Sequence, residues 1–213
     1  MSYRTFTRGE PLPAVVSALA VAAAGALAFA AYDFGPQSKH MGLHIVAMNV
    51  AAPLAAAAIS KSLPHWTERY RTLWMSAALQ LALLWAWHAP SMQHAFAGSH
   101  GYHLVAHALL FLSAFLFWGA IIRLPATGRW QGIAALLVTG KLACLLSALL
   151  IFSPRALYDI SLHPGPQLHD QQLAGLLMIT ACPLSYLIAA VVIAAQFINR
   201  LAQASKPAPL STG

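Results

Sequence analysis

The sequence predicts an all-α fold: a polytopic transmembrane helical bundle of about six spans that forms a single domain. Of its 213 residues, 59% are hydrophobic and only 8% are charged, whereas a soluble domain carries about a quarter of its residues as charged types. The mean hydropathy is +0.65. The apolar residues also fall into stretches near the length of about 20 residues that a bilayer helix needs. This composition excludes an ordinary soluble enzyme, a disordered chain and a disulfide-stapled secreted scaffold.

Six apolar stretches, separated by short polar breaks, define the predicted spans. They are apolar around most of their circumference, as expected of helices that face both lipid and other helices. They cover residues 11–32, 40–60, 73–88, 102–122, 132–152 and 170–198. The tail, 199–213, is predicted to be disordered. Since no soluble domain fits into what remains, any chemistry must lie in the bilayer or at its edges.

The first stretch has two interpretations. Arg4 and Arg8, an apolar run and the sequence Ala28-Phe29-Ala30 resemble a cleavable signal peptide. The run of about 20 residues exceeds the usual 7–15 of a signal peptide, which favours a retained helix. Cleavage would leave five spans with the same orientation.

The positions of the basic residues predict the orientation. On the predicted outer side of the membrane, the only basic residues are Lys39 and Arg155, and Lys141 lies within the fifth stretch. The other side holds Arg4, Arg8, Lys61, Arg69, Arg71, Arg123, Arg129, Arg200 and Lys206. By the positive-inside rule, both termini are cytoplasmic. The net charge of +7 therefore reflects orientation and does not indicate a nucleic-acid partner.

Ten histidines stand against five carboxylates, and their distribution is the main functional signal. Only His65 lies on the predicted cytoplasmic side. The predicted outer side holds His40, His44, His88, His94, His100, His103, His107, His163 and His169. An even scatter would divide the histidines between both sides, so this asymmetry predicts a site near the outer surface.

Two histidine pairs have metal-ligand spacing. His40 and His44 are four residues apart, as are His103 and His107, so each pair projects from one helix face. The deeper member of each pair lies about 6 Å further into the membrane. Two such pairs on neighbouring helices can offer four imidazoles to one ion. His88 stands where a helix must end, just before Pro90.

Sulfur and carboxylate groups extend the candidate metal site. Met41 and Met48 add thioethers on the helix of His44. Imidazole binds zinc, copper, iron and nickel, whereas thioether favours Cu(I). Asp170 begins the last span, where it either caps the helix or serves the metal site, by orienting a histidine ring or by ligating directly.

Other unusual residues receive structural interpretations. A polar role in the headgroup region is expected of His94, His100, His163 and His169. Interfacial anchoring is expected of Trp74, Trp85, Trp87, Trp118 and Trp130. Cys144 and Cys182, without CxxC spacing, are expected to be small buried hydrophobes. Lys141 needs neutralisation or a polar partner in mid-membrane, for which Asn49, Gln80 and Ser147 lie at similar depth.

Three ordered blocks resemble the CtaG family of cytochrome c oxidase assembly factors. The first is Lys39-His40-Met41-Gly42-Leu43-His44 with Met48 and Ala52-Pro53-Leu54. The second is Trp87-His88-Ala89-Pro90, His103-Leu104-Val105-Ala106-His107 and Phe117-Trp118. The third is Leu157-Tyr158, Asp170-Gln171-Gln172-Leu173-Ala174-Gly175-Leu176 and Met178.

The resemblance implies a multi-pass protein of the bacterial inner membrane that matures a haem–copper oxidase, by handling copper and not as an enzyme. The blocks contain His40, His44, His88, His103, His107 and Asp170. The implied partners are cytochrome c oxidase subunits and a periplasmic copper donor. Three alternatives stay open from the residues: a haem b protein with axial histidines, a zinc-dependent intramembrane hydrolase with Asp170 as acid/base, and a scaffold whose histidines only pack.

Overall fold

The computed structural model describes residues 35–62, 69–96, 99–158 and 165–204. The chain divides into two compact units, Met1–Gly35 and Pro36–Gly213, and all the described helices belong to the second. The first predicted span, 11–32, lies outside the described residues. So do His65, His163 and residues 205–213 of the predicted tail.

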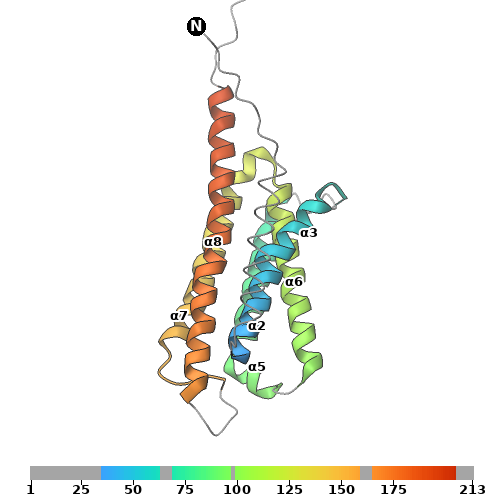
Figure 1. Cartoon of the computed structure of the whole chain (residues 1–213). Coiled ribbons are helices and arrows are strands. Elements are labelled where there is room, and N and C mark those ends of the chain that lie inside the picture. Colours follow the sequence, from blue (N-terminus) through green and yellow to red (C-terminus); the bar gives the residue numbers. More distant parts are fainter. Residues whose placement is uncertain (1–34, 63–68, 97–98, 159–164, 205–213) are drawn as a thin grey trace, which may run out of the picture. The chain divides into compact units, whose positions relative to one another are not determined.

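The described part of the chain is all-helical, with no strand, as the sequence predicted (Figure 1). Its elements are α2 Pro36–Val46, η1 Ala47–Ala51, α3 Ala52–Ala58, η2 Ser60–Ser62, α4 Tyr70–Trp87, α5 Pro90–Ala95, α6 His100–Arg123, η4 Ala126–Gly128, α7 Arg129–Phe152 and α8 Gly165–Ala204. Every predicted span within the described ranges coincides with helix. The last helix continues beyond the predicted end at residue 198 and into the predicted tail.

Among the described residues, four segments are long and apolar enough to cross a membrane. They are Pro36–Ala58, Gly101–Arg123, Ala126–Phe152 and Gln167–Gln203. The predicted span 73–88 is also helical, as α4, but it is not among the four. Arg71 and Gln80 lower the hydropathy of this helix.

The helices pack as pairs within this unit. The most extensive packing is between α7 and α8, followed by that between α4 and α6. In addition, α2 packs on α8, and α3 packs on α6. Figure 1 shows α7 and α8 side by side. Their close approach depends on Gly175, where an added Cβ would lie 2.8 Å from Ile151 Cγ1 and 3.1 Å from the Ser147 carbonyl oxygen. A small residue here allows the backbones to meet.

A π-helical turn, η1, joins α2 to α3. The amide of Ala52 donates to the Ala47 carbonyl, five residues back. The Met48 carbonyl would take the next amide in this pattern, but Pro53 has no N–H. The Trp118 indole fills the gap, with Nε1 donating to that carbonyl at 3.0 Å. Trp118 is thus buried, and its prediction as an interfacial anchor is wrong.

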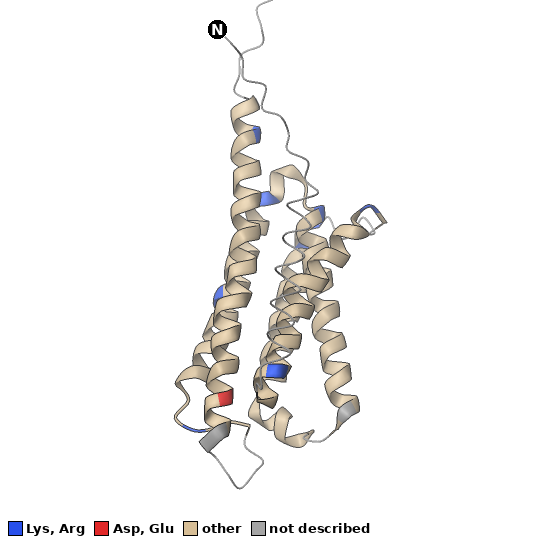
Figure 2. Cartoon of the chain, viewed as in Figure 1, with Lys and Arg blue, Asp and Glu red and all other residues tan. Residues whose placement is uncertain are grey.

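Basic side chains gather at one end of the unit. Arg123 and Arg129 flank the junction of α6 and α7. Contacts of Ser60, Tyr70 and Gln196 with this junction bring four more basic residues to the same end: Lys61, Arg69, Arg71 and Arg200. Figure 2 shows basic residues gathered toward this end. Lys39, near the beginning of α2, and Arg155, after α7, belong to the opposite end. The arrangement follows the charge pattern from which the orientation was inferred.

Lys141 is exposed on α7, and in the described part of the chain it makes no hydrogen bond to Asn49, Gln80 or Ser147. The three residues considered as partners bond elsewhere. Asn49 accepts a hydrogen bond from Ser185, Gln80 donates to the Tyr186 hydroxyl, and Ser147 donates to the Ala143 carbonyl. The lysine lies on the outer surface of α7.

Candidate metal centre

Five of the predicted imidazoles meet near one end of the bundle. His40 and His44 come from α2, His103 and His107 from α6, and His88 follows the end of α4. Ring centroids are separated by 4.4 Å for His44–His107, 4.5 Å for His40–His107, 4.6 Å for His40–His44, 5.2 Å for His40–His103 and 5.9 Å for His44–His88. Three separate helices thus bring their histidines together.

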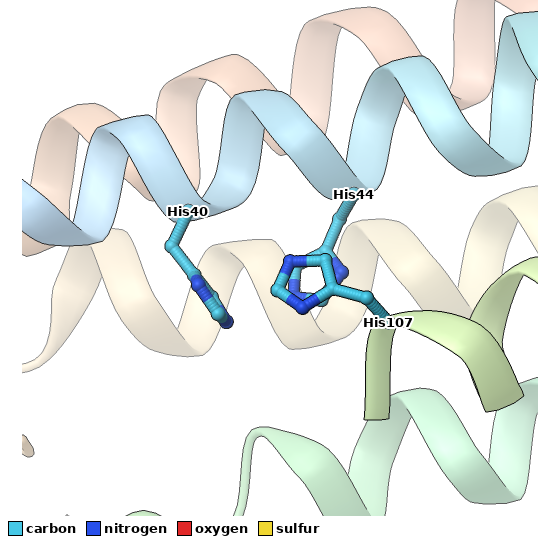
Figure 3. A group of neighbouring side chains, drawn as sticks. All are labelled: His40, His44 and His107. Carbon is cyan, nitrogen blue, oxygen red and sulfur yellow. The ribbon is translucent and has the colours of Figure 1, made fainter. Parts of the chain in front are cut away.

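The tightest group is His40, His44 and His107, whose candidate ligand atoms lie within 4.8 Å of one another. Figure 3 shows His40 and His44 projecting from one helix, with the His44 and His107 rings overlapping. Ligand nitrogens around a tetrahedral zinc lie about 3.4 Å apart, given Zn–N bonds of about 2.0 Å. Ring rotations that draw the nitrogens together by about an ångström would therefore hold an ion.

Hydrogen bonds to backbone carbonyls fix two of these rings. His107 Nδ1 lies 2.6 Å from the His103 carbonyl oxygen, and His88 Nδ1 lies 2.7 Å from that of Leu84. A carbonyl only accepts, so Nδ1 carries the hydrogen and Nε2 keeps the lone pair. His107 Nε2 is buried without a hydrogen-bond partner. Metal-binding histidines are commonly oriented in this way, by donating their second nitrogen to a carbonyl.

His44 is the most unusual member. Its side chain is 2% exposed, and neither ring nitrogen has a hydrogen-bond partner. A neutral imidazole offers one donor and one acceptor, and a buried polar atom left unsatisfied costs about 1–3 kcal/mol. The orphaned nitrogens call for an explanation, and an ion bound to the lone pair supplies one.

Trp87 belongs to this site, which corrects its prediction as an interfacial anchor. Its side chain is buried, stacks on Tyr102 at 4.6 Å, and donates from Nε1 to His40 Nε2 at 3.3 Å. An indole N–H can only donate, so His40 Nε2 carries its lone pair toward the tryptophan. The available signal was its position directly before His88.

Asp170 does not contact the imidazoles through any observed hydrogen bond. Because α8 begins at Gly165, it is not the N-cap of its own helix. Its carboxylate instead accepts hydrogen bonds from the amides of Gln37 (2.8 Å) and Ser38 (3.0 Å) and from the Ser38 hydroxyl. Asp170 therefore caps the first turn of α2, two residues before His40, as an N-cap supplied by another helix.

A loop segment supports His88 from the other side. Tyr158 donates its hydroxyl to the His88 carbonyl at 2.9 Å, and burial raises the pKa of this phenol, so it remains a donor. Gln171 holds the segment by accepting from the Leu157 amide at 2.6 Å and donating to the Leu150 carbonyl. These contacts connect the segment after α7 with the helix that carries Asp170.

The remaining predicted residues divide into two groups. Met41 and Met48 are buried, and both line a cavity with His44. His94 and His169 are exposed, and His94 Nε2 donates to the Leu157 carbonyl at 3.1 Å. The side chain of His100 lies outside what the structure describes. No imidazole contact connects His94 or His169 with the cluster in the described part of the chain.

Comparison with known proteins adds a family assignment. The family described as cytochrome c oxidase caa3 assembly factor (Caa3_CtaG) matches residues 5–200. No match was found among the curated proteins or among the solved structures. The family match spans nearly the whole sequence and includes every residue of the imidazole cluster. The chain therefore belongs to the cytochrome c oxidase caa3 assembly factor family.

Proposed function

We propose that this protein binds copper at the cluster of His40, His44 and His107 and supplies it during cytochrome c oxidase assembly. Membership of the assembly-factor family supports the role in oxidase assembly. The observation that carries the metal role is the buried imidazole of His44, which has no hydrogen-bond partner and lies beside two further imidazoles. Copper suits the donors, since imidazole accepts both copper states and the neighbouring thioethers favour Cu(I).

The proposed setting is the bacterial inner membrane, with both termini in the cytoplasm and the cluster near the outer face. The basic residues gathered at the opposite end of the bundle support this orientation. From that face the protein would receive copper from a periplasmic donor and pass it to oxidase subunits. It acts in this proposal as a carrier and not as an enzyme.

Two alternatives fit the geometry less well. A zinc hydrolase would need Asp170 as acid/base, but its carboxylate oxygens are occupied by the first turn of α2. A haem needs axial ligands on opposite faces of its ring. The His44 and His107 rings instead stack face to face at 4.4 Å, without room for a macrocycle between them.

The direct test is copper binding by the full chain, purified in detergent. We expect about one copper ion per chain at this cluster, because three converging imidazoles form one site. The double variant His44→Ala/His107→Ala should lose it, whereas His169→Ala, an exposed histidine in the same end of the bundle, should not. Elemental analysis and a visible spectrum distinguish copper, zinc and haem. Equal copper in the double variant and the wild type would refute the proposal.

The cellular test uses the same variants. In cells that lack this chain, wild type and His169→Ala should restore an oxidase that contains copper, and the double variant should not. Restoration by the double variant would show that assembly does not use the imidazoles.

A further inference from the structure

A small cavity lies directly beneath the imidazole cluster. It has about 20 Å³ of space for a water-sized sphere, which is enough for about one water molecule or ion. His44 lines it from above, so this residue belongs to both the cluster and the cavity. Its further lining includes four sulfur side chains: Met41, Met48, Met178 and Cys182.

The sulfur atoms are concentrated at this one place. Among the methionines that the structure describes, the three that line the cavity are 5%, 5% and 1% exposed. The other two, Met75 and Met92, are 59% and 38% exposed and lie elsewhere. Methionines that only fill gaps in an apolar core would not need to gather around one cavity, so the clustering favours a role for their sulfur atoms.

Polar atoms around the cavity are incompletely satisfied. Gln80 donates to Tyr186, but its Oε1 has no hydrogen-bond partner, and neither has the hydroxyl of Thr139. Both residues line the cavity and are at most 2% exposed, as is His44 with its two unpartnered nitrogens. Buried polar atoms are rarely left without a partner, so a water molecule or an ion in this cavity would satisfy them.

The thiol is held in a defined orientation. Asn49 accepts a hydrogen bond at Oδ1 from Ser185 and donates from Nδ2 to Cys182 Sγ at 3.3 Å. Cys144, the other cysteine, is not among the cavity residues.

We propose that this cavity is a second metal site, specific for a soft monovalent cation, Cu(I), bound by sulfur from Met41, Met48, Met178 and Cys182. Thioethers select Cu(I), and the single cysteine sulfur accepts it as well, whereas Cu(II) favours the imidazoles above, which also bind zinc. The proposal goes beyond the proposed function, since the cluster could hold copper while the sulfur cavity held none. His44 lies between both sets of ligands, so Cu(I) could exchange nitrogen for sulfur ligands without crossing an apolar layer.

The test compares Cu(I) and Zn(II) binding to the full chain in detergent, under anaerobic reducing conditions with a competing Cu(I) chelator. We expect the wild type to bind about two Cu(I) ions and about one Zn(II) ion. Met178→Leu/Cys182→Ser should lose one Cu(I) and keep the Zn(II). Met75→Leu, an exposed methionine, is the matched control and should match the wild type. In His107→Ala, X-ray absorption should show the retained Cu(I) bound by sulfur.

Thermal unfolding of each variant serves as the control that the variant is folded. If the double variant unfolds, Met178→Leu alone decides, because it nearly conserves side-chain volume. In Met178→Leu, the affinity of the sulfur cavity for its Cu(I) ion should then fall by about 10- to 100-fold, the range seen when one supporting group of a metal site is removed. Unchanged Cu(I) stoichiometry and affinity in these variants overturns the sulfur site. Unchanged Cu(I) and Zn(II) binding in His107→Ala overturns the imidazole site instead, so the two failures are distinguishable.

Discussion

Replacing Asp170 by Ala should destabilise the protein through α2, although the substitution lies in α8. The carboxylate accepts two backbone amides and one hydroxyl from Gln37 and Ser38, and Ser38 is fully buried. Loss of a helix cap costs about 0.5–2 kcal/mol, and the lost charge at the positive end of α2 adds about 0.3–1 kcal/mol. One buried amide left without an acceptor adds about 1–3 kcal/mol. We expect a total loss of about 2–6 kcal/mol.

The assay is a double-mutant cycle between Asp170 and Ser38, with unfolding of the full chain followed in detergent. Ser38→Ala removes only the hydroxyl that donates to the carboxylate. It should destabilise the wild type, and in Asp170→Ala it should cost less, because of the two acceptors of this hydroxyl only the backbone carbonyl of residue 170, at 3.1 Å, remains. We expect a coupling energy of about 1 kcal/mol. His169→Ala, one residue away and exposed, is the control and should change little.

Copper binding separates capping from ligation. As a cap, Asp170 acts on the metal only by positioning His40, so Ser38→Ala should also weaken copper binding, and Asp170→Asn should retain part of it. Strict additivity of the two stability losses would refute the capping role. Copper loss in Asp170→Asn as complete as in Asp170→Ala, with Ser38→Ala unaffected, would identify the carboxylate as a ligand.

Three further predictions concern neighbouring contacts. Trp87→Phe keeps the stacking but removes the donor to His40 Nε2, so titration should show copper affinity raised by about 2- to 10-fold, the worth of one hydrogen bond. Trp118→Phe leaves a buried carbonyl unpaired and should cost about 1–3 kcal/mol in unfolding experiments. That cost should shrink in the Pro53→Ala background, where a backbone amide can replace the indole; an equal cost in both backgrounds would contradict the explanation. Gly175→Ala should separate α7 from α8 and lower the unfolding temperature, and an unchanged temperature would show that the interface adjusts freely.

Helix positions and the shared face of each histidine pair could be predicted from local spacing. His40 and His44 project from one side of α2, as four-residue spacing requires. Their contact with His107 depends on how two helices pack together. The resemblance and the clustering of histidines on the outer side suggested this contact, but it cannot be derived from helical periodicity alone. Ligation itself stays a prediction until a metal is measured.

The roles of Asp170 and Trp118 could not be read from sequence, because both serve distant backbone groups. Asp170 bonds residues more than 130 positions away, whereas the sequence suggested a cap of its own helix or a role at the metal site. The available signal for Trp118 was Pro53, which has no amide N–H and so leaves one carbonyl on its helix without a donor. Which carbonyl this is depends on the π-helical turn, which the sequence does not reveal. Trp87 was similarly assigned from its residue type, since tryptophans of membrane proteins favour the interface.

The contacts along α2 constrain how the cluster can accept an ion. Asp170 fixes its first turn, Trp118 fixes the Met48 carbonyl, and Asn49 is bonded to α8. The backbone around His44 is thus held from both sides, by neighbours on two other helices. The imidazoles must therefore close onto an ion by rotation of their side chains. The His44 ring makes no hydrogen bond that would resist this rotation. An ion is then selected by the donor atoms it prefers and not by rearrangement of the bundle.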